Sequence, residues 1–293
     1  MNAIETYKLT KYYGSSRGIV DVTLSVDEGD FYGFIGPNGA GKSTLIRTLL
    51  GLISPTDGRA SVLGRDIIAD KVEILKNIGY LPSETAFYSG MRVSDVLTLS
   101  ARLREIDCRE EAKKLCERLE LDTSKRVDEL SLGNRKKVGI VAALQHRPSL
   151  YILDEPTSGL DPLMQKEFYS ILTERNEEGA TVFLSSHILS EVGRYCKSAA
   201  VIREGRILAA DKVENLVHTG IKRVTLRGVE GVPAIKNAES IKCDGDTVSF
   251  LYSGKPSELI SELGGVSFED VNITSPELDE IFMHYYVKEG DAK

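Results

Sequence analysis

The chain has 293 residues, of which 41% are hydrophobic and 28% charged, so it can hold one large domain and a smaller one. Its net charge of −7 and isoelectric point near 5.3 disfavour nucleic acid as the main partner, because proteins that bind nucleic acid usually present a basic face. No run reaches the roughly 20 apolar residues that span a bilayer, the N-terminus lacks the apolar core of a signal peptide, and the four cysteines form no C-x-x-C pair. We therefore expect a cytoplasmic protein with reduced thiols, in which any membrane role needs a partner.

The first elements that the sequence predicts are strands. Residues 4–9 and 22–26 are β-like runs. Residues 31–35 form a short, wholly apolar run, which is typical of a buried strand.

A glycine-rich loop follows this buried strand directly. Residues 36–44 match the pattern G-x-x-x-x-G-K-[ST], and an apolar stripe from Leu45 to Leu50 predicts a helix behind them. In the order strand, loop, helix, this pattern binds phosphate, because backbone N–H groups and the positive end of the helix dipole surround the phosphate oxygens. Lys42 would then reach the β- and γ-phosphates, and the Ser43 hydroxyl would ligate Mg²⁺. The residues expected around the nucleotide are Gly36, Pro37, Asn38, Gly39, Ala40, Gly41, Lys42, Ser43 and Thr44.

The middle of the chain changes character twice. Residues from about 93 to 119 are helix-rich, whereas from Leu150 onward short apolar strands alternate with helices. The later strands are expected at residues 150–153, 182–184 and 199–202. Alternating strands and helices predict a parallel sheet covered on both faces, so a helical insertion interrupts an α/β core.

Beyond residue 220 the pattern becomes one of antiparallel strands. Val224 and Leu226, and then residues 248–252, alternate at period two, which predicts half-buried strands. A change of phase predicts a bulge or break near residues 269–270, and Ser275 is expected to cap a final helix. We therefore expect two domains, residues 1–219 and a small α+β domain at residues 220–293.

Two carboxylates end the strand at residues 150–153. Asp154 would hold the Mg²⁺ shell opposite Ser43 through a bound water, and Glu155 would orient and deprotonate the water that attacks the γ-phosphate. Acidic residues often end strands, but behind a phosphate loop in an α/β chain this pair predicts nucleotide hydrolysis.

Four further motifs accompany the loop and the carboxylate pair. Leu130–Asn134 reads Leu-Ser-Leu-Gly-Asn, Ser158–Asp161 reads Ser-Gly-Leu-Asp, Ser185–His187 reads Ser-Ser-His, and Tyr13 stands upstream in Lys-Tyr-Tyr-Gly. Their order resembles the ABC-family ATPases, with an LSGGQ signature, a D-loop, a switch histidine and an aromatic residue that stacks on adenine. The resemblance covers roughly residues 4–215 and is to the ATP-binding subunits of ABC-2-type exporters. The C-terminal segment resembles the tail domain of the bacitracin and antibiotic-peptide export subfamily.

This resemblance implies a fold and an activity. The fold is a P-loop NTPase core of the ABC ATPase type with a mainly parallel sheet, an N-terminal antiparallel β-subdomain, an inserted helical subdomain at about residues 83–147 and a small C-terminal α+β domain. The activity is hydrolysis of ATP, with Mg²⁺, coupled to transport by a separate integral-membrane permease. The permease would hold the protein at the inner face of the cell membrane, with no nucleic acid as partner.

The resemblance also assigns roles to individual residues. Tyr13 would stack on adenine, and Ser131 and the Gly133 N–H would bind the γ-phosphate held by a second subunit. Asp161 would contribute to the nucleotide site from the D-loop. His187 would contact the γ-phosphate and position the water of Glu155, which makes Glu155, His187 and Lys42 the catalytic set. Because one chain cannot complete its own site, ATP would join two subunits, and a homodimer would suffice.

The chain departs from the family pattern at two places. Where most relatives carry a glutamine that touches Mg²⁺, this chain has Ser83 followed by Glu84. Ser83 is shorter, so either water fills the gap between Ser83 and the metal, or Glu84 takes the role. In the signature, Leu132 and Asn134 replace glycine and glutamine. A working but slow ATPase is expected.

The loop after Ser83 is apolar and carries Phe87, Tyr88 and Met91. These side chains either pack under the helical insertion or face a partner. In the family this region lines the groove that receives a short permease helix, so we expect the three residues to form part of that groove.

A second class of function fits part of the same pattern. Soluble ABC ATPases that act on ribosomes or nucleic acid share the motifs, but ribosome-acting relatives usually fuse two cassettes, and chromosome-type relatives insert long coiled coils before the signature. A P-loop kinase or GTPase would have no use for a signature serine and a switch histidine. The sequence therefore favours transport.

Overall fold

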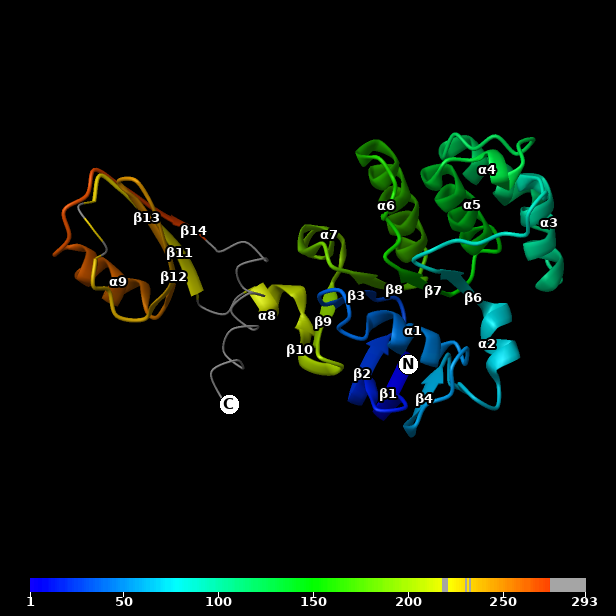
Figure 1. Ribbon diagram of the computed structural model, residues 1–293, viewed down its shortest axis with the longest axis horizontal. Coiled ribbons are helices and arrows are strands. Elements are labelled where there is room, and N and C mark those ends of the chain that lie inside the picture. Colours follow the sequence, from blue (N-terminus) through cyan, green and yellow to red (C-terminus); the bar gives the residue numbers. More distant parts are fainter. Residues whose placement is uncertain (218–220, 230, 232, 275–293) are drawn as a thin grey trace. The chain divides into compact units, whose positions relative to one another are not determined.

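The computed structural model describes residues 1–217, 221–229, 231 and 233–274. It divides the chain into two compact units, Met1–Val213 and Glu214–Lys293, whereas the sequence patterns place a domain boundary between residues 219 and 220. The helix expected from Ser275 lies outside the described residues. Figure 1 shows the elements of each unit.

The first unit begins with an antiparallel sheet in the order β2-β1-β4-β5. Its strands are β1 (Asn2–Tyr13), β2 (Ser16–Asp27), β4 (Asp57–Val62) and β5 (Arg65–Asp66). The first two strands are longer than their apolar runs predict, because backbone pairing continues through polar residues to a tight turn in which Gly14 has a φ of 60°. The expected N-terminal antiparallel subdomain is thus confirmed.

A six-stranded sheet in the order β10-β9-β3-β8-β7-β6 forms the centre of the first unit. All neighbours are parallel except β10 and β9, which are antiparallel. The strands are β3 (Phe31–Ile35), β6 (Ile78–Leu81), β7 (Leu150–Asp154), β8 (Thr181–Ser186), β9 (Ser198–Arg203) and β10 (Arg206–Lys212). Every residue of β3, β7 and β8 is buried, which explains why these strands read as continuous apolar runs.

Helices surround this sheet, and three of them form the expected insertion between β6 and β7 (Figure 1). The inserted helices are α3 (Val93–Leu103), α4 (Arg109–Arg118) and α5 (Leu132–Leu144), with the short 3₁₀ helix η1 (Val127–Glu129). The others in the first unit are α1 (Lys42–Leu49), α2 (Lys71–Asn77), α6 (Pro162–Glu177) and α7 (Leu189–Tyr195), whereas α8 (Val213–Val217) starts at the last residue of this unit and continues into the second. Arg118 of α4 forms ion pairs of 2.6 Å with Glu167 and Glu174 of α6, which tie the insertion to the core. Among the described helices, none combines the length and the apolar composition that crossing a bilayer requires.

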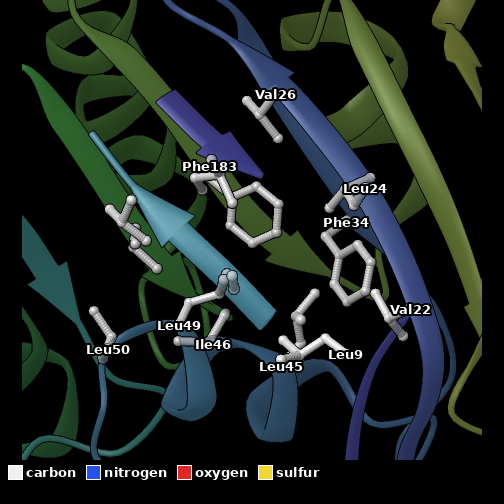
Figure 2. Close-up of a cluster of buried hydrophobic side chains, with 14 of the residues drawn as sticks. Leu9, Val22, Leu24, Val26, Phe34, Leu45, Ile46, Leu49, Leu50 and Phe183 are labelled. Carbon is white, nitrogen blue, oxygen red and sulfur yellow. The ribbon is translucent and has the colours of Figure 1, made fainter. Parts of the chain in front are cut away.

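The main core lies between the two sheets and includes α1 (Figure 2). The figure labels Leu9, Val22, Leu24 and Val26 from the antiparallel sheet, Phe34 and Phe183 from the parallel sheet, and Leu45, Ile46, Leu49 and Leu50 from and just after α1. The ring of Phe183 packs 5.6 Å from that of Phe34, measured between centroids. Each such side chain contributes about 1.5–3 kcal/mol when it is fully buried. The helix behind the phosphate loop is therefore held firmly against both sheets.

Beyond α8, the second unit contains an antiparallel sheet in the order β12-β13-β11-β14 and the helix α9. Its elements are β11 (Ile221–Arg227), β12 (Ala238–Asp244), β13 (Thr247–Ser253), α9 (Pro256–Leu263) and β14 (Asp270–Thr274). Val224, Leu226 and Phe250 are buried with Leu259 and Leu263 of α9. The sheet starts again at Asp270, where a break is expected, whereas β12 and α9 are additional elements that the sequence analysis did not identify.

Candidate functional site

The phosphate loop joins the end of β3 to the start of α1. Gly41 has a φ of 110°, and a Cβ built there would lie 2.7 Å from the carbonyl oxygen of Gly18, so both conformation and space require glycine. Gly41 is also the N-cap of α1 and provides no side-chain hydrogen bond to the helix. The first N–H groups of the helix are therefore not capped by a side chain, as an anion site at a helix N-terminus requires.

Lys42 lies inside this loop and is 6% exposed. Its Nζ donates hydrogen bonds to the carbonyl oxygens of Gly36 at 2.6 Å and Pro37 at 3.2 Å, and it lies 3.1 Å from Oε1 of Glu155. A buried ammonium needs such partners. In this structure the positive charge that the sequence assigns to the phosphates is paired with the predicted general base.

The two carboxylates come from the end of β7, next to β8. Asp154 is 1% exposed, and its Oδ1 accepts a 2.6 Å hydrogen bond from the Ser185 hydroxyl. Glu155 has a left-handed backbone with a φ of 47°, and its N–H donates to both the carbonyl oxygen and Oγ of Ser185 at 3.2 Å. The parallel register pairs Asp154 with Ser185, so the serine holds the backbone at which the chain leaves the strand.

His187 follows β8 and completes a continuous group of side chains. Its Nδ1 lies 2.7 Å from Oε2 of Glu155, and the histidine side chain is 48% exposed. Lys42 and His187 thus contact the two carboxylate oxygens of Glu155. The structure brings the three predicted catalytic residues together at the carboxyl ends of β3, β7 and β8.

The donor set for a metal consists of the Asp154 carboxylate and the Ser43 hydroxyl, at the half-buried first turn of α1. Within the described part of the chain no cluster of three or more His, Cys, Asp or Glu side chains could hold a metal. Mg²⁺ commonly binds through one or two carboxylates together with substrate phosphates and water. The residues present therefore fit a Mg²⁺ ion that arrives with a nucleotide. Ser83 is half-buried, and its carbonyl oxygen accepts a hydrogen bond from Lys136.

Tyr13 ends β1 and is 47% exposed. A Cβ built on Gly18 would lie 2.8 Å from Cγ2 of Thr44 and 3.2 Å from Cε2 of Tyr13. The tyrosine ring and the last residue of the phosphate loop therefore both lie against Gly18. This places an accessible aromatic ring beside the loop, where a nucleotide base could stack on it.

The signature and the D-loop form a second group of predicted site residues. Ser131 is the N-cap of α5, and its side chain accepts a 3.3 Å hydrogen bond from the Asn134 N–H. A Cβ on Gly133 would lie 2.9 Å from the carbonyl oxygen of Gly159, so the two segments pack closely there. Asp161 caps α6 by accepting hydrogen bonds from the N–H groups of Leu163 and Met164.

Sequence reasoning gave no role to two residues of this site. The Ser185 hydroxyl donates a hydrogen bond to the Asp154 carboxylate and accepts one from the Glu155 N–H. In the sequence it is marked only as a serine near the end of a wholly buried strand. Lys136 is buried on α5 and reaches the backbone of Glu155. In the sequence it is one of three consecutive basic residues, 135–137, on a helix whose other positions are mostly apolar, and nothing there sets it apart from its two neighbours.

Comparisons with known proteins agree with this geometry. The family model described as "ABC transporter" matches residues 19–158. The "Bacitracin transport ATP-binding protein BcrA" of Bacillus licheniformis is 41% identical over 211 residues, covering 70% of this chain and 68% of that protein. The "Uncharacterized ABC transporter ATP-binding protein YhaQ" of Bacillus subtilis (strain 168) is 31% identical over 287 residues, covering 94% and 95%. A solved "Structure of ATP binding subunit of ABC transporter" superposes with a TM-score of 0.70 at 31% identity, covering 73% of this chain and 91% of that chain.

Proposed function

Because the chain belongs to the ABC transporter family as an ATP-binding subunit that hydrolyses ATP, we propose that it powers an exporter through a separate membrane permease. The similarity to a bacitracin transport protein supports export as the direction and peptide-like antibiotics as the class of cargo. The same similarity favours transport over the alternative of a soluble ATPase that acts on ribosomes or nucleic acid. We further propose that residues 1–219 form the ATPase domain, with the helical subdomain at about 83–147, and that residues 220–293 form an accessory domain.

The observation that carries the catalytic proposal is the position of Glu155 between Lys42 and His187. When ATP binds, its phosphates would replace Glu155 as the partner of the Lys42 ammonium. Oε1 of Glu155 would then be free to accept a proton from the attacking water. His187 would contact the γ-phosphate and position that water, while its Nδ1 holds Oε2 of Glu155 so that Oε1 faces the water. Mg²⁺ bound through Ser43 and Asp154 would neutralise phosphate charge, and Ser83 is proposed as a weaker contact to that ion.

The remaining site residues would surround the nucleotide from two subunits. Tyr13 would stack on adenine, and the backbone N–H groups of residues 36–44 would bind its phosphates. Ser131, Gly133 and Asp161 would act on the nucleotide held by the other subunit. ABC ATPase cassettes dimerise, and a pair of identical copies would contain two complete sites.

The partner surface proposed for the permease is a groove beside α3. Phe87, Tyr88 and Met91 line this groove of about 470 Å³ together with Leu99 and Leu103 of the helix. Tyr88 is 76% exposed, which is unusual for an aromatic side chain without a partner. A short amphipathic permease helix would fit such an apolar groove and would hold the protein at the cytoplasmic face of the cell membrane.

The catalytic proposal is tested with Glu155→Gln. This variant keeps the shape of the side chain but cannot accept the proton, so the turnover number should fall by at least about 10²-fold while MgATP still binds. The variant should accumulate as an ATP-bound dimer, which light scattering measures. Turnover close to that of the unchanged protein would refute the role of Glu155.

The groove proposal is tested by co-purification of the permease encoded with this protein. Replacing Tyr88 and Met91 with serine should abolish co-purification and leave the ATPase activity of the isolated subunit unchanged. Serine at Leu52, an exposed apolar residue outside the groove, is the matched control. A folded double variant that still holds its permease would place the docking surface elsewhere.

A further inference from the structure

Lys136 is a buried charge for which the proposed chemistry has no use. It lies in the second turn of α5 and is 3% exposed. Its Nζ donates to three carbonyl oxygens: Ser83 at 2.9 Å, Pro82 at 3.0 Å and Glu155 at 3.1 Å. An ammonium group has three donors, so every one of them is used.

The three acceptors belong to two different functional segments. Pro82 and Ser83 follow β6, in the loop where the family carries its glutamine, and Glu155 follows β7. Lys136 itself lies on the helix that starts at the Ser131 cap. One ammonium group therefore joins the signature helix, the Ser83 loop and the backbone of the proposed general base.

Burying the Lys136 ammonium costs free energy, because the charge loses its contact with water. Burial lowers the pKa of Lys136 to about 8, even though the nearby Asp154 and Glu155 carboxylates act in the opposite direction. Glu155 in turn contacts Lys42 and His187 through its carboxylate. An apolar side chain would avoid the cost of burying a charge. The buried charge is therefore better explained by the three carbonyl groups that it binds than by a gain in stability.

What Lys136 holds is a strained piece of backbone. A glutamate in the left-handed region costs roughly 1–3 kcal/mol and persists only where its surroundings fix it. Ser185 binds the N–H of Glu155, and Lys136 binds its C=O. These two contacts hold both peptide planes that flank the α-carbon of Glu155, and so they fix the direction of the Cα–Cβ bond that carries the carboxylate towards Lys42 and His187.

We propose that Lys136 is a positioning residue for ATP hydrolysis, which fixes the backbone of Glu155 and makes that conformation depend on the Ser83 loop and the signature helix. This inference rests on the proposed role of Glu155 as general base. It predicts that movement of either segment, by a permease or by a second subunit, changes the turnover number through Lys136.

The first test compares Lys136→Met with Lys136→Arg. Methionine keeps the apolar stem and removes the ammonium, so the turnover number should fall by at least about 10-fold while ATP affinity changes less than about 3-fold, because misplaced groups cost rate and not binding. Arginine, which also donates to carbonyls, should restore most of the rate. Lys166→Met, at an exposed lysine on α6, controls for the loss of a positive charge and should leave the rate unchanged.

The second test is a double-mutant cycle with Glu155→Gln. If Lys136 acts through Glu155, then Lys136→Met should lower the turnover number of the unchanged protein but not the residual rate of Glu155→Gln. Equal losses in both backgrounds, or no loss in either, would overturn the proposal. Failure of the underlying function would look different, since Glu155→Gln alone would then hydrolyse ATP at the ordinary rate.

Discussion

The phosphate loop and the signature segment both use glycines at the start of a helix, yet they differ in how far one chain completes them. The loop is enclosed: Lys42 is buried, bonded to loop carbonyls and paired with Glu155. The signature segment is exposed to solvent at Ser131 and Leu132. Ser131 there hydrogen-bonds to its own helix, of which it is the N-cap. Enclosure lets a single chain bind a nucleotide, whereas an exposed helix end can act only on a nucleotide that another molecule presents. The difference therefore predicts which substitutions damage binding and which damage only turnover.

The largest effect is expected from Lys42→Ala in the enclosed site. Removing the ammonium deletes a charge-assisted contact to the phosphates and leaves the Glu155 carboxylate to repel them, so ATP affinity should fall by about 10²-fold or more. Isothermal titration of the isolated subunit measures this. Lys76→Ala, at a half-exposed lysine on α2, should bind ATP normally. Unaltered affinity in the Lys42 variant would show that the enclosed arrangement does not govern binding.

Gly133→Ala should have a smaller effect and only on turnover. A Cβ there would lie 2.9 Å from the carbonyl oxygen of Gly159, so the signature and D-loop must separate. ATP should bind as before, but the turnover number should drop by at least about 10-fold because the phosphate contact proposed for Gly133 of a second subunit is lost.

Mixing the Lys42→Ala and Gly133→Ala proteins tests whether each site uses residues of two chains. A mixed dimer contains one site with the damage from both variants and one intact site. An equal mixture should therefore recover about a quarter of the original rate, if dimers form at random and sites act independently. Sites completed within one chain would give no recovery at all.

The smallest effect concerns the adenine. Tyr13→Ala should weaken ATP binding by about 10-fold, because stacking of a base on an aromatic ring is worth about 1–3 kcal/mol. Tyr12→Ala is the matched control, since the neighbouring residue of a strand points to the opposite face and Tyr12 is also exposed. An equal effect of both substitutions would remove the stacking role from Tyr13.

Sequence patterns predicted the architecture well where residues were buried on a regular period. The apolar runs at residues 31–35 and 150–153 correspond to β3 and β7, and the phosphate loop precedes α1 as expected. By contrast, β12 has mostly exposed side chains, so it lacks the alternation that reveals a half-buried strand. The strand β12 forms because its backbone pairs with β13, and the pattern of its own side chains does not predict this pairing.

The sequence by itself determined the parts of the site that are contiguous in the chain. The loop at residues 36–44 and the pair Asp154–Glu155 each depend on local order, which sets backbone conformation over a few residues. Only the tertiary structure decided that Glu155 meets Lys42 and His187 through its carboxylate, and Ser185 and Lys136 through its backbone. The physical reason is the parallel sheet: its register aligns the carboxyl ends of β3, β7 and β8, and no pattern within one segment encodes which distant side chain will arrive beside it.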